Sequence, residues 1–222
     1  MIITPVIDTH RLSILANAFE REMVQFLQDL ESRREVRVPR IRMEMEKSGF
    51  EEIRLDPTGT VLGRIGSGRW QILMSAHTGA PGAAGMASLV YAGKLIYELG
   101  MYGDFTLWIA GTAREEEIGG GLIPECALIA QPTGLRIYRG FRGRVELEES
   151  HALVQSAIAT YEALFELPPL VELAPVSMLG LPAIAFGPGD AAVERTPVRQ
   201  LVKAAQFYAA FPLMCADHLA RH

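Results

Sequence analysis

The sequence predicts an α/β fold with a largely parallel sheet. Two stretches, 72–76 (ILMSA) and 104–112 (DFTLWIAGT), are apolar throughout, as in central strands that are covered on both faces. A helical pattern over 83–99 separates them. Strands that alternate with helices in this way form parallel βαβ units, and a hairpin can add an antiparallel edge to the sheet.

Five helices are predicted, mostly from apolar residues that recur three and four positions apart. They cover 12–30, 39–49, 83–99, 150–166 and 196–218. Pro39 suits the first turn of a helix because its φ is fixed, and Pro197 follows the N-cap residue Thr196. Gly100 is expected to end the third helix, since glycine adopts the left-handed conformation at low cost. Pro212 cannot donate an amide hydrogen, so it should kink the last helix or end its first part.

The predicted strands are separated by turn sequences. Three lie within 50–76, and the others are at 104–112, 126–130, 135–148 and 181–187. The sequences DPTG at 56–59 and GSG at 66–68 divide the first of these stretches. The stretch 135–148 predicts an antiparallel hairpin that turns at 140–143. The chain shows no internal repeat and no linker, so we expect a single domain over residues 1–222.

Composition narrows the classes of function. Hydrophobic residues make up 49% of the 222 residues and charged residues 21%, which favours a buried core over disorder. The net charge of -5 argues against a nucleic-acid partner, which needs a basic face. We find no apolar run of the length of a membrane span and no signal segment, so no membrane partner is expected. Cys126 and Cys215 lack the spacing of a metal or redox motif and are expected to be buried free thiols of a cytoplasmic protein.

A single histidine, His77, follows the apolar strand at 72–76. Open α/β sheets bind ligands at the carboxyl ends of their strands, so this histidine is a candidate site residue. The loop after it, TGAPGAAG at 78–85, holds no side chain that could ligate a metal, donate a proton or attack a carbonyl. A hydrogen-bonded histidine without a catalytic role is the simpler interpretation.

Eight stretches along nearly the whole chain, in order, resemble a family of zinc-dependent deacylases and exopeptidases. Among them are GFEEIRLDPTGTVLGRIGSG, ILMSAH, DFTLWIAGTAREEE, PTGLRIYRGFRGRVEL and LPAIAFGPGD. The family includes acetylornithine deacetylase, succinyl-diaminopimelate desuccinylase and carboxypeptidase G. The resemblance implies a three-layer zinc-exopeptidase-like fold, with a mixed, mostly parallel sheet and helices on both faces. It also implies two zinc ions, bridged by an aspartate and a water, and a glutamate as general base in amide hydrolysis.

The first part of the family's metal site is degraded in this sequence. The family's strand-end motif His-x-Asp is here His77-Thr78-Gly79, so the carboxylate that orients the histidine is missing. The bridging aspartate normally follows a much longer loop. Here that loop is reduced to 79–84, and GMAS at 85–88 resumes the family pattern. The resemblance therefore implies that His77 is the remnant of a zinc ligand.

Of the family's other metal-site residues, this sequence retains only some. Glu115 matches the general base and Glu116 matches a metal ligand. Gln131 stands where the family has a glutamate ligand, and a neutral amide binds zinc poorly. Arg195 stands where the family has a histidine ligand, and arginine stays protonated and cannot coordinate a metal. We expect Arg195 to pair with Glu115 or Glu116 in place of the metal.

The family's inserted lid domain, which serves dimerisation, is also missing. It should follow RVELE, but near residue 149 the chain continues directly into a helix like the one that follows the lid. The core pattern is kept while the loops of the site are lost. This combination favours a catalytically degenerate protein that acts as a non-catalytic structural or regulatory subunit and needs no cofactor. Its partner would be a second copy, an intact paralogue or another protein that covers the surface exposed by the absence of the lid.

Two other functions stay open. A residual or repurposed amidohydrolase could bind one metal, such as zinc, through His77, Glu115 and Glu116 together with a recruited ligand, because one-metal hydrolysis needs only three ligands and a water. A small-molecule sensor could use the cleft at the strand ends.

Overall fold

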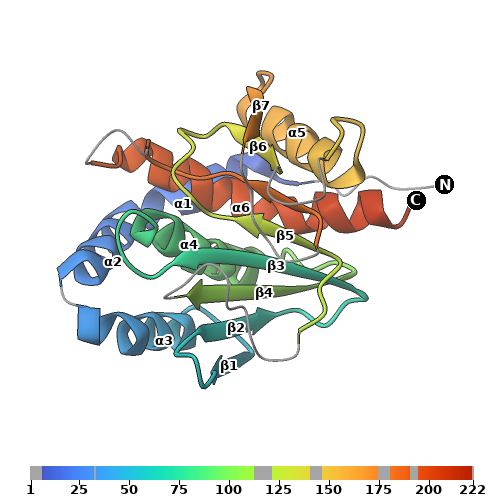
Figure 1. Ribbon diagram of the computed structural model, residues 1–222. Coiled ribbons are helices and arrows are strands. Elements are labelled where there is room, and N and C mark those ends of the chain that lie inside the picture. The colour runs from blue at the N-terminus through green and yellow to red at the C-terminus, as the bar shows by residue number, and fades with distance from the viewer. Residues whose placement is uncertain are drawn as a thin grey trace.

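The computed structural model of the chain describes residues 7–32, 34–112, 122–140, 147–174, 181–190 and 195–221. These residues form one sheet of eight strands in the order β1-β2-β4-β3-β5-β8-β6-β7 (Figure 1). The strands are β1 Glu52–Leu55, β2 Val61–Ile65, β3 Trp70–His77, β4 Phe105–Thr112, β5 Cys126–Ile129, β6 Ile137–Gly140, β7 Val171–Ala174 and β8 Ala183–Ala185.

The centre of the sheet is parallel. β4, β3, β5 and β8 lie side by side and run in the same direction, so their carboxyl ends meet at one edge. β1 and β2 are added antiparallel beside β4, while β6 is antiparallel to β8 and parallel to β7. This arrangement confirms the predicted mixed, mostly parallel sheet. The three strands expected within 50–76 are β1, β2 and β3.

The helices of the described residues lie where the sequence predicts helices, but one of the five predicted helices is observed as two, and the ends differ. They are α1 Thr9–Ala18, α2 Glu20–Ser32, α3 Arg37–Lys47, α4 Ala83–Leu99, α5 Ala152–Phe165 and α6 Val198–Leu219, with a short 3-10 turn at Arg34–Val36. The predicted helix over 12–30 is divided into α1 and α2 at Phe19. Gly100 ends α4 with a φ of 63°, as expected. α6 continues through Pro212 to Leu219, so the proline does not end it.

The predicted hairpin over 135–148 is wrong in its pairing. Its first strand forms as β6, but β6 pairs with β8 on one side and with β7 on the other. Both edges of β6 are therefore occupied by strands from later in the chain, whereas most of the expected second strand, at 144–148, lies outside the described residues. β7 at Val171–Ala174 was not predicted, because its four residues include a glutamate and show no clear apolar alternation.

The helices of the described residues all pack on one face of the sheet. Their buried side chains share a single core with alternate strand residues such as Ile72 and Met74. Figure 1 shows α4 and α6 behind the central strands. The opposite face carries a second cluster of strand side chains, such as Leu73 and Trp108, to which no described helix contributes. We expected helices on both faces, and within the described residues they cover one.

Candidate functional site

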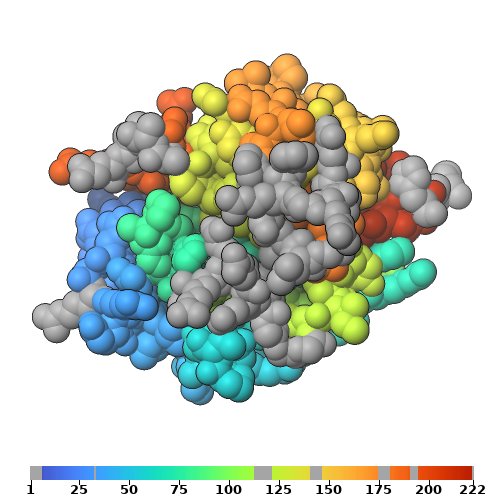
Figure 2. Space-filling model, in the orientation of Figure 1, coloured from blue at the N-terminus to red at the C-terminus, as the bar shows by residue number. Residues whose placement is uncertain are grey.

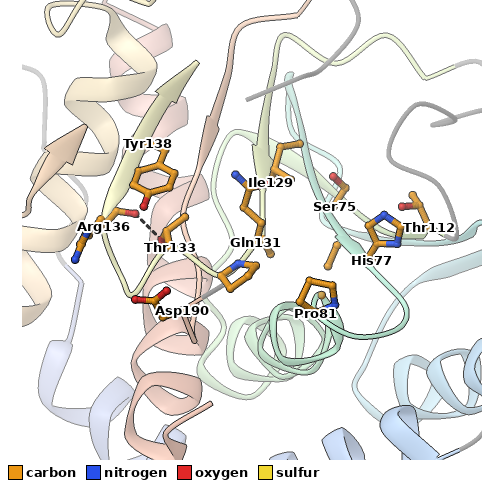
Figure 3. A pocket seen from close by; sticks show the side chains of 14 residues that line it. Ser75, His77, Pro81, Thr112, Ile129, Gln131, Thr133, Arg136, Tyr138 and Asp190 are labelled. Atoms are coloured by element: carbon orange, nitrogen blue, oxygen red, sulfur yellow. Dashed lines mark hydrogen bonds between the residues drawn. The ribbon is translucent and has the colours of Figure 1, made fainter. Parts of the chain in front are cut away.

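A cavity of about 520 Å³ opens where the carboxyl ends of β3, β4 and β5 meet (Figure 3). Its polar side chains are Ser75, His77, Thr112, Gln131, Thr133, Arg136, Tyr138 and Asp190. Figure 3 shows Ser75, His77 and Thr112 on one side and Thr133, Tyr138 and Asp190 on the other. This edge is where open α/β sheets bind ligands. His77, which the sequence analysis singled out, lines this cavity.

The loop after His77 is a tight turn that packs against the histidine. Thr78 donates its amide to the carbonyl of Thr112 at 3.0 Å, which extends the pairing of β3 with β4. The amide of Gly82 then donates to the carbonyl of Gly79 at 2.8 Å, so the chain turns back directly into α4. A Cβ at Gly82 would overlap the Cβ of His77, so this close approach requires glycine.

Gly79, the position of the expected aspartate, faces a cation. Arg37 is the first residue of α3, and its Nε–H donates to the carbonyl of Leu30 at 2.6 Å. A Cβ placed on Gly79 would overlap the guanidinium of Arg37. Because Gly79 is buried, the guanidinium takes up the space that an acidic side chain would need. Arg37 was not singled out in the sequence, since only the fold brings α3 to the loop after β3.

The first turn of α4 adds positive potential at the same edge of the sheet. Gly82 is the N-cap of this 17-residue helix, and it has no side chain to cap the free amides. A helix of this length carries about half an elementary charge at its N-terminal end. Gly85 lets this end approach β5 closely, because a Cβ there would overlap the carbonyl oxygen of Ala130. The helix end and Arg37 together disfavour another cation beside them.

Thr133 joins the turn after β5 to the turn after β8. Its Oγ accepts the amide of Gly187 at 3.0 Å and donates to the carbonyl of Arg136 at 2.7 Å. Thr133 also forms an isolated antiparallel bridge with Asp190. A Cβ at Gly187 would overlap the carbonyl of Gln131, so the two turns are in direct contact. This contact fixes the position of Gln131 at the cavity.

Comparison with known sequences finds one curated relative in two strains of Escherichia coli. The uncharacterized protein YgeY of strain K12 is 35% identical over 177 residues. The match takes up 60% of this chain and 44% of YgeY, so the matched region spans less than half the length of that relative. Because 177 positions exceed 60% of the 222 residues here, YgeY has positions within the match that this chain lacks. No model of a known protein family matches the chain.

Solved structures of peptidases share the fold at low sequence identity. The LapA aminopeptidase of Legionella pneumophila superimposes with a TM-score of 0.70 over 97% of this chain and 77% of its own, at 10% identity. YxeP of Bacillus subtilis, a dinuclear metal-binding peptidase of the M20 family, gives 0.62 over 89% and 98%, at 12% identity. The aminopeptidase APDkam598 of the archaeon Desulfurococcus kamchatkensis gives 0.65 over 87% and 95%, at 10% identity. The chain has a metallopeptidase-like fold. At such identities the likeness concerns the fold and carries no statement about activity.

Only some of the expected site residues lie together at the cavity. His77 and Gln131 both line the cavity. Arg195 is exposed and is not among the residues that line it. Glu115 and Glu116 lie outside the described residues, so the expected pairing of Arg195 with them stays a prediction. Within the part of the chain that the structure describes, no three His, Cys, Asp or Glu side chains are grouped so that they could hold a metal ion.

Sequence reasoning missed the polar groups that line the cavity beside His77 and Gln131. Thr112 ends β4, and Tyr138 belongs to β6, which the sequence placed in a hairpin rather than next to β8. Thr133 was visible in the Pro-Thr motif after Gln131, and its role is to hold two turns together through hydrogen bonds. Within the described residues, no helix is both long enough and apolar enough to span a membrane.

Proposed function

We propose that this chain is a catalytically degenerate, metallopeptidase-like protein that acts as a non-catalytic structural or regulatory subunit. The observation that carries the proposal is the guanidinium of Arg37 at Gly79. In the family that the sequence resembles, an aspartate at this position orients a zinc-binding histidine. Here the acid is replaced by hydrogen, and the space beside it is taken by a fixed positive charge.

The substitutions at two other ligand positions of the family also lower the affinity for zinc. Gln131 offers a neutral amide at the cavity in place of a carboxylate, which lowers the affinity for zinc. Arg195 replaces a histidine ligand by a permanent cation. The uncapped N-terminal end of α4 adds positive potential beside Pro81 and Gly82, which line the cavity. The described residues therefore do not fit a pair of zinc ions, and we derive no catalytic step that uses them.

The length of the chain is compatible with this proposal. The alignment with YgeY contains positions that this chain lacks, which is compatible with the shortened loop and the missing lid that the family resemblance implies. YgeY itself is uncharacterized, so it supplies no activity for comparison.

The alternative is a hydrolase that keeps one metal. It would use His77 from the cavity together with Glu115 and Glu116, which match the general base and a ligand in the resemblance. Three protein ligands and a water are sufficient for metal-assisted hydrolysis. The experiment must therefore distinguish a one-metal hydrolase from a non-catalytic subunit.

The decisive experiment measures bound metal and turnover together. The purified chain is incubated with zinc, passed through a desalting column and analysed for metal, and it is then assayed on N-acyl amino acids and dipeptides. We expect less than stoichiometric zinc and the same background hydrolysis for the wild type and Glu115→Gln. One zinc per chain, with hydrolysis that falls in Glu115→Gln, would overturn the proposal in favour of the one-metal enzyme.

A further inference from the structure

Two hydroxyl groups in the cavity at the strand ends are buried without a hydrogen-bond partner among the described residues. Ser75 is 6% exposed and Thr112 is 2% exposed, and both residues line the cavity. Neither side chain forms a hydrogen bond with any part of the chain that the structure describes. Buried polar side chains are nearly always paired, because an unpaired one has lost its bonds to water. The two hydroxyls therefore point to a ligand that enters the cavity from outside the chain.

The pairing of β3 with β4 places both hydroxyls on one face of the sheet. Ser75 and His77 are two residues apart in β3, so their side chains point to the same side. His77 lies opposite Thr112 in the register of the two strands, and Thr112 therefore continues this row of polar side chains. Figure 3 shows the three side chains together at one side of the cavity. A single ligand group can reach both hydroxyls there.

The charges on this side of the cavity favour an anion over a cation. Pro81 and Gly82 line the cavity immediately before α4, and Gly82 leaves the helix end without a side-chain cap. The first amides of a helix have no acceptor within it, and the helix dipole places partial positive charge there. The guanidinium of Arg37 adds a full positive charge beside Gly79. A negative group at this end of the cavity is therefore stabilised, as anions at helix N-termini are.

The other side of the cavity suits the uncharged part of a small molecule. Nη1 of Arg136 already lies 3.3 Å from Oε1 of Glu172, and the anion of Asp190 is on the same side of the cavity. Gln131 and Tyr138 offer neutral hydrogen-bonding groups. The lining also includes apolar residues, which are Ala76, Ile129, Ala130 and Pro132.

The cavity is large enough for such a molecule and lies between two surface segments. Its volume of about 520 Å³ is typical of small-molecule sites. Figure 2 shows the two segments next to each other on the surface, the start of α4 in green and the residues after β5 in yellow-green.

We propose that the cavity binds a small organic carboxylate without a metal ion. The carboxylate lies at the start of α4 and accepts hydrogen bonds from the hydroxyls of Ser75 and Thr112. A carboxylate has acceptors only, so it matches two hydroxyls and a helix end that can all donate to it. The neutral remainder of the acid extends toward Gln131 and Tyr138. The inference rests on the proposed function, since zinc ions in the cavity would themselves bind a carboxylate, and it makes the acid the ligand that a regulatory subunit senses.

The first experiment compares three probes of similar shape that differ in charge. Phenylacetate, phenylacetamide and phenethylammonium are titrated into the full chain at pH 7 in the presence of EDTA, and the shifts of its amide NMR signals give each dissociation constant. We expect phenylacetate to bind with a Kd of about 1 mM or below, at least about fivefold more tightly than phenylacetamide. Phenethylammonium should bind at least about tenfold more weakly than phenylacetate, because Arg37 and the helix end repel it. Inorganic phosphate should also bind more weakly than phenylacetate, since it cannot use the apolar lining.

Two threonine substitutions in β4 distinguish a ligand-binding hydroxyl from a structural one. Thr112→Val removes the hydroxyl in the cavity and keeps the shape, so the Kd for phenylacetate should rise at least about fivefold. Thr106→Val, at the other end of the same strand, removes a hydroxyl that donates to the carbonyl of Gly68 at 2.7 Å, and it should leave the Kd unchanged. In thermal unfolding without ligand, Thr106→Val should lower the Tm. Thr112→Val should not, because its hydroxyl has no hydrogen bond to lose.

Several results would overturn the inference. They are the absence of phenylacetate binding up to about 10 mM, binding of the amide, the ammonium or phosphate as tight as that of phenylacetate, and an unchanged Kd in a folded Thr112→Val. Binding of phenylacetate that appears only after zinc replaces EDTA would overturn it as well. Zinc content and turnover are measured without these probes, so failure of this inference is distinct from failure of the proposed function.

Discussion

The thiols of Cys126 and Cys215 lie 3.6 Å apart in the core, although 89 positions separate them in the chain. Cys126 belongs to β5 and Cys215 to α6, and both are buried and free. The sequence predicted buried free thiols but gave no sign that they are in contact. The contact exists because α6 crosses behind the central strands, which no local pattern indicates.

We expect these thiols to be unreactive in the native protein. Hydrogen bonding with Cys126 and burial raise the pKa of the Cys215 thiol, so little thiolate is present at neutral pH. Reaction with Ellman's reagent should be at least about 100-fold slower than for a free thiol, and both should react once guanidinium unfolds the chain. A prompt reaction of two thiols in the native state would contradict this.

The loop after His77 provides a test of close packing with a matched pair of glycines. Gly82→Ala would place its Cβ against the Cβ and backbone of His77, which cannot move without distorting β3. Gly79→Ala would meet the end of the Arg37 side chain, which can swing away at the loss of its bond to Leu30. We expect Gly82→Ala to lower the free energy of unfolding by about 2 to 3 kcal/mol and Gly79→Ala by about 1 kcal/mol.

Urea unfolding followed by circular dichroism measures both variants. Equal losses would show that Arg37 is held as firmly as the backbone at His77, contrary to the expectation that its side chain swings away. A smaller loss for Gly82→Ala than for Gly79→Ala would contradict the geometry of the turn itself.

The turn between β1 and β2 makes stability depend on pH. Oδ1 of Asp56 accepts the amides of Thr58 and Thr60, each at 2.9 Å, and the hydroxyl of Thr58 at 2.7 Å. Burial of the carboxyl raises its pKa, but these hydrogen bonds outweigh burial and hold the pKa below the ordinary value of 3.8. The folded state therefore favours the carboxylate. Its contribution is complete above the unfolded pKa and is lost as the pH falls through the folded pKa.

We expect Asp56→Asn to lower the free energy of unfolding by about 1 kcal/mol at pH 7 and by less at pH 3. Glu98→Gln, at an exposed position of α4, is the control and should change little at either pH. Urea titrations at the two pH values measure the difference. A loss for Asp56→Asn that is equal at pH 7 and pH 3 would show that the charge of Asp56 is not what stabilises the turn.

Local patterns were sufficient for much of the fold. The ends of α4 followed from its apolar spacing and Gly100, and the central strands followed from continuous apolar runs. The break at Phe19 was not predictable, because neither glycine nor proline marks it. The ring of Phe19 packs on Tyr91 of α4, with 6.0 Å between ring centres, so the contact that accompanies the break comes from a distant part of the chain.

The residues of the candidate site also divide into those that the sequence indicated and those that only tertiary contacts bring there. His77 was singled out because it follows a recognisable strand, and Gln131 because it stands at a ligand position of the family that the sequence resembles. The parallel sheet brings both strand ends to one edge. Arg37 was missed because its place beside Gly79 depends on how α3 packs, which is a tertiary relationship. The pairing of β6 with β8 was missed for the same reason, since strand partners that are distant in sequence leave no local trace.

A buried acid of α3 offers a final test, in which tertiary contacts decide the outcome. Glu44 is 6% exposed; its carboxylate accepts the hydroxyl of Tyr91 at 2.6 Å and an N–H of Arg40 at 2.6 Å. Burial and this carboxylate raise the pKa of Tyr91, which therefore stays a donor at all ordinary pH values. On the same helix, Glu46 pairs with Arg42 at 3.0 Å, and both of these side chains are exposed. Sequence alone would rank the two glutamates alike.

We expect Glu44→Gln to lower the free energy of unfolding by about 2 kcal/mol, because it leaves Arg40 with less charge compensation in a partly buried place. Glu46→Gln should lower it by less than about 0.5 kcal/mol, since an exposed pair is screened by water. Both values come from urea unfolding at neutral pH. If the two substitutions cost the same, the hydrogen bond of Glu44 to Tyr91 does not help to hold α3 on α4.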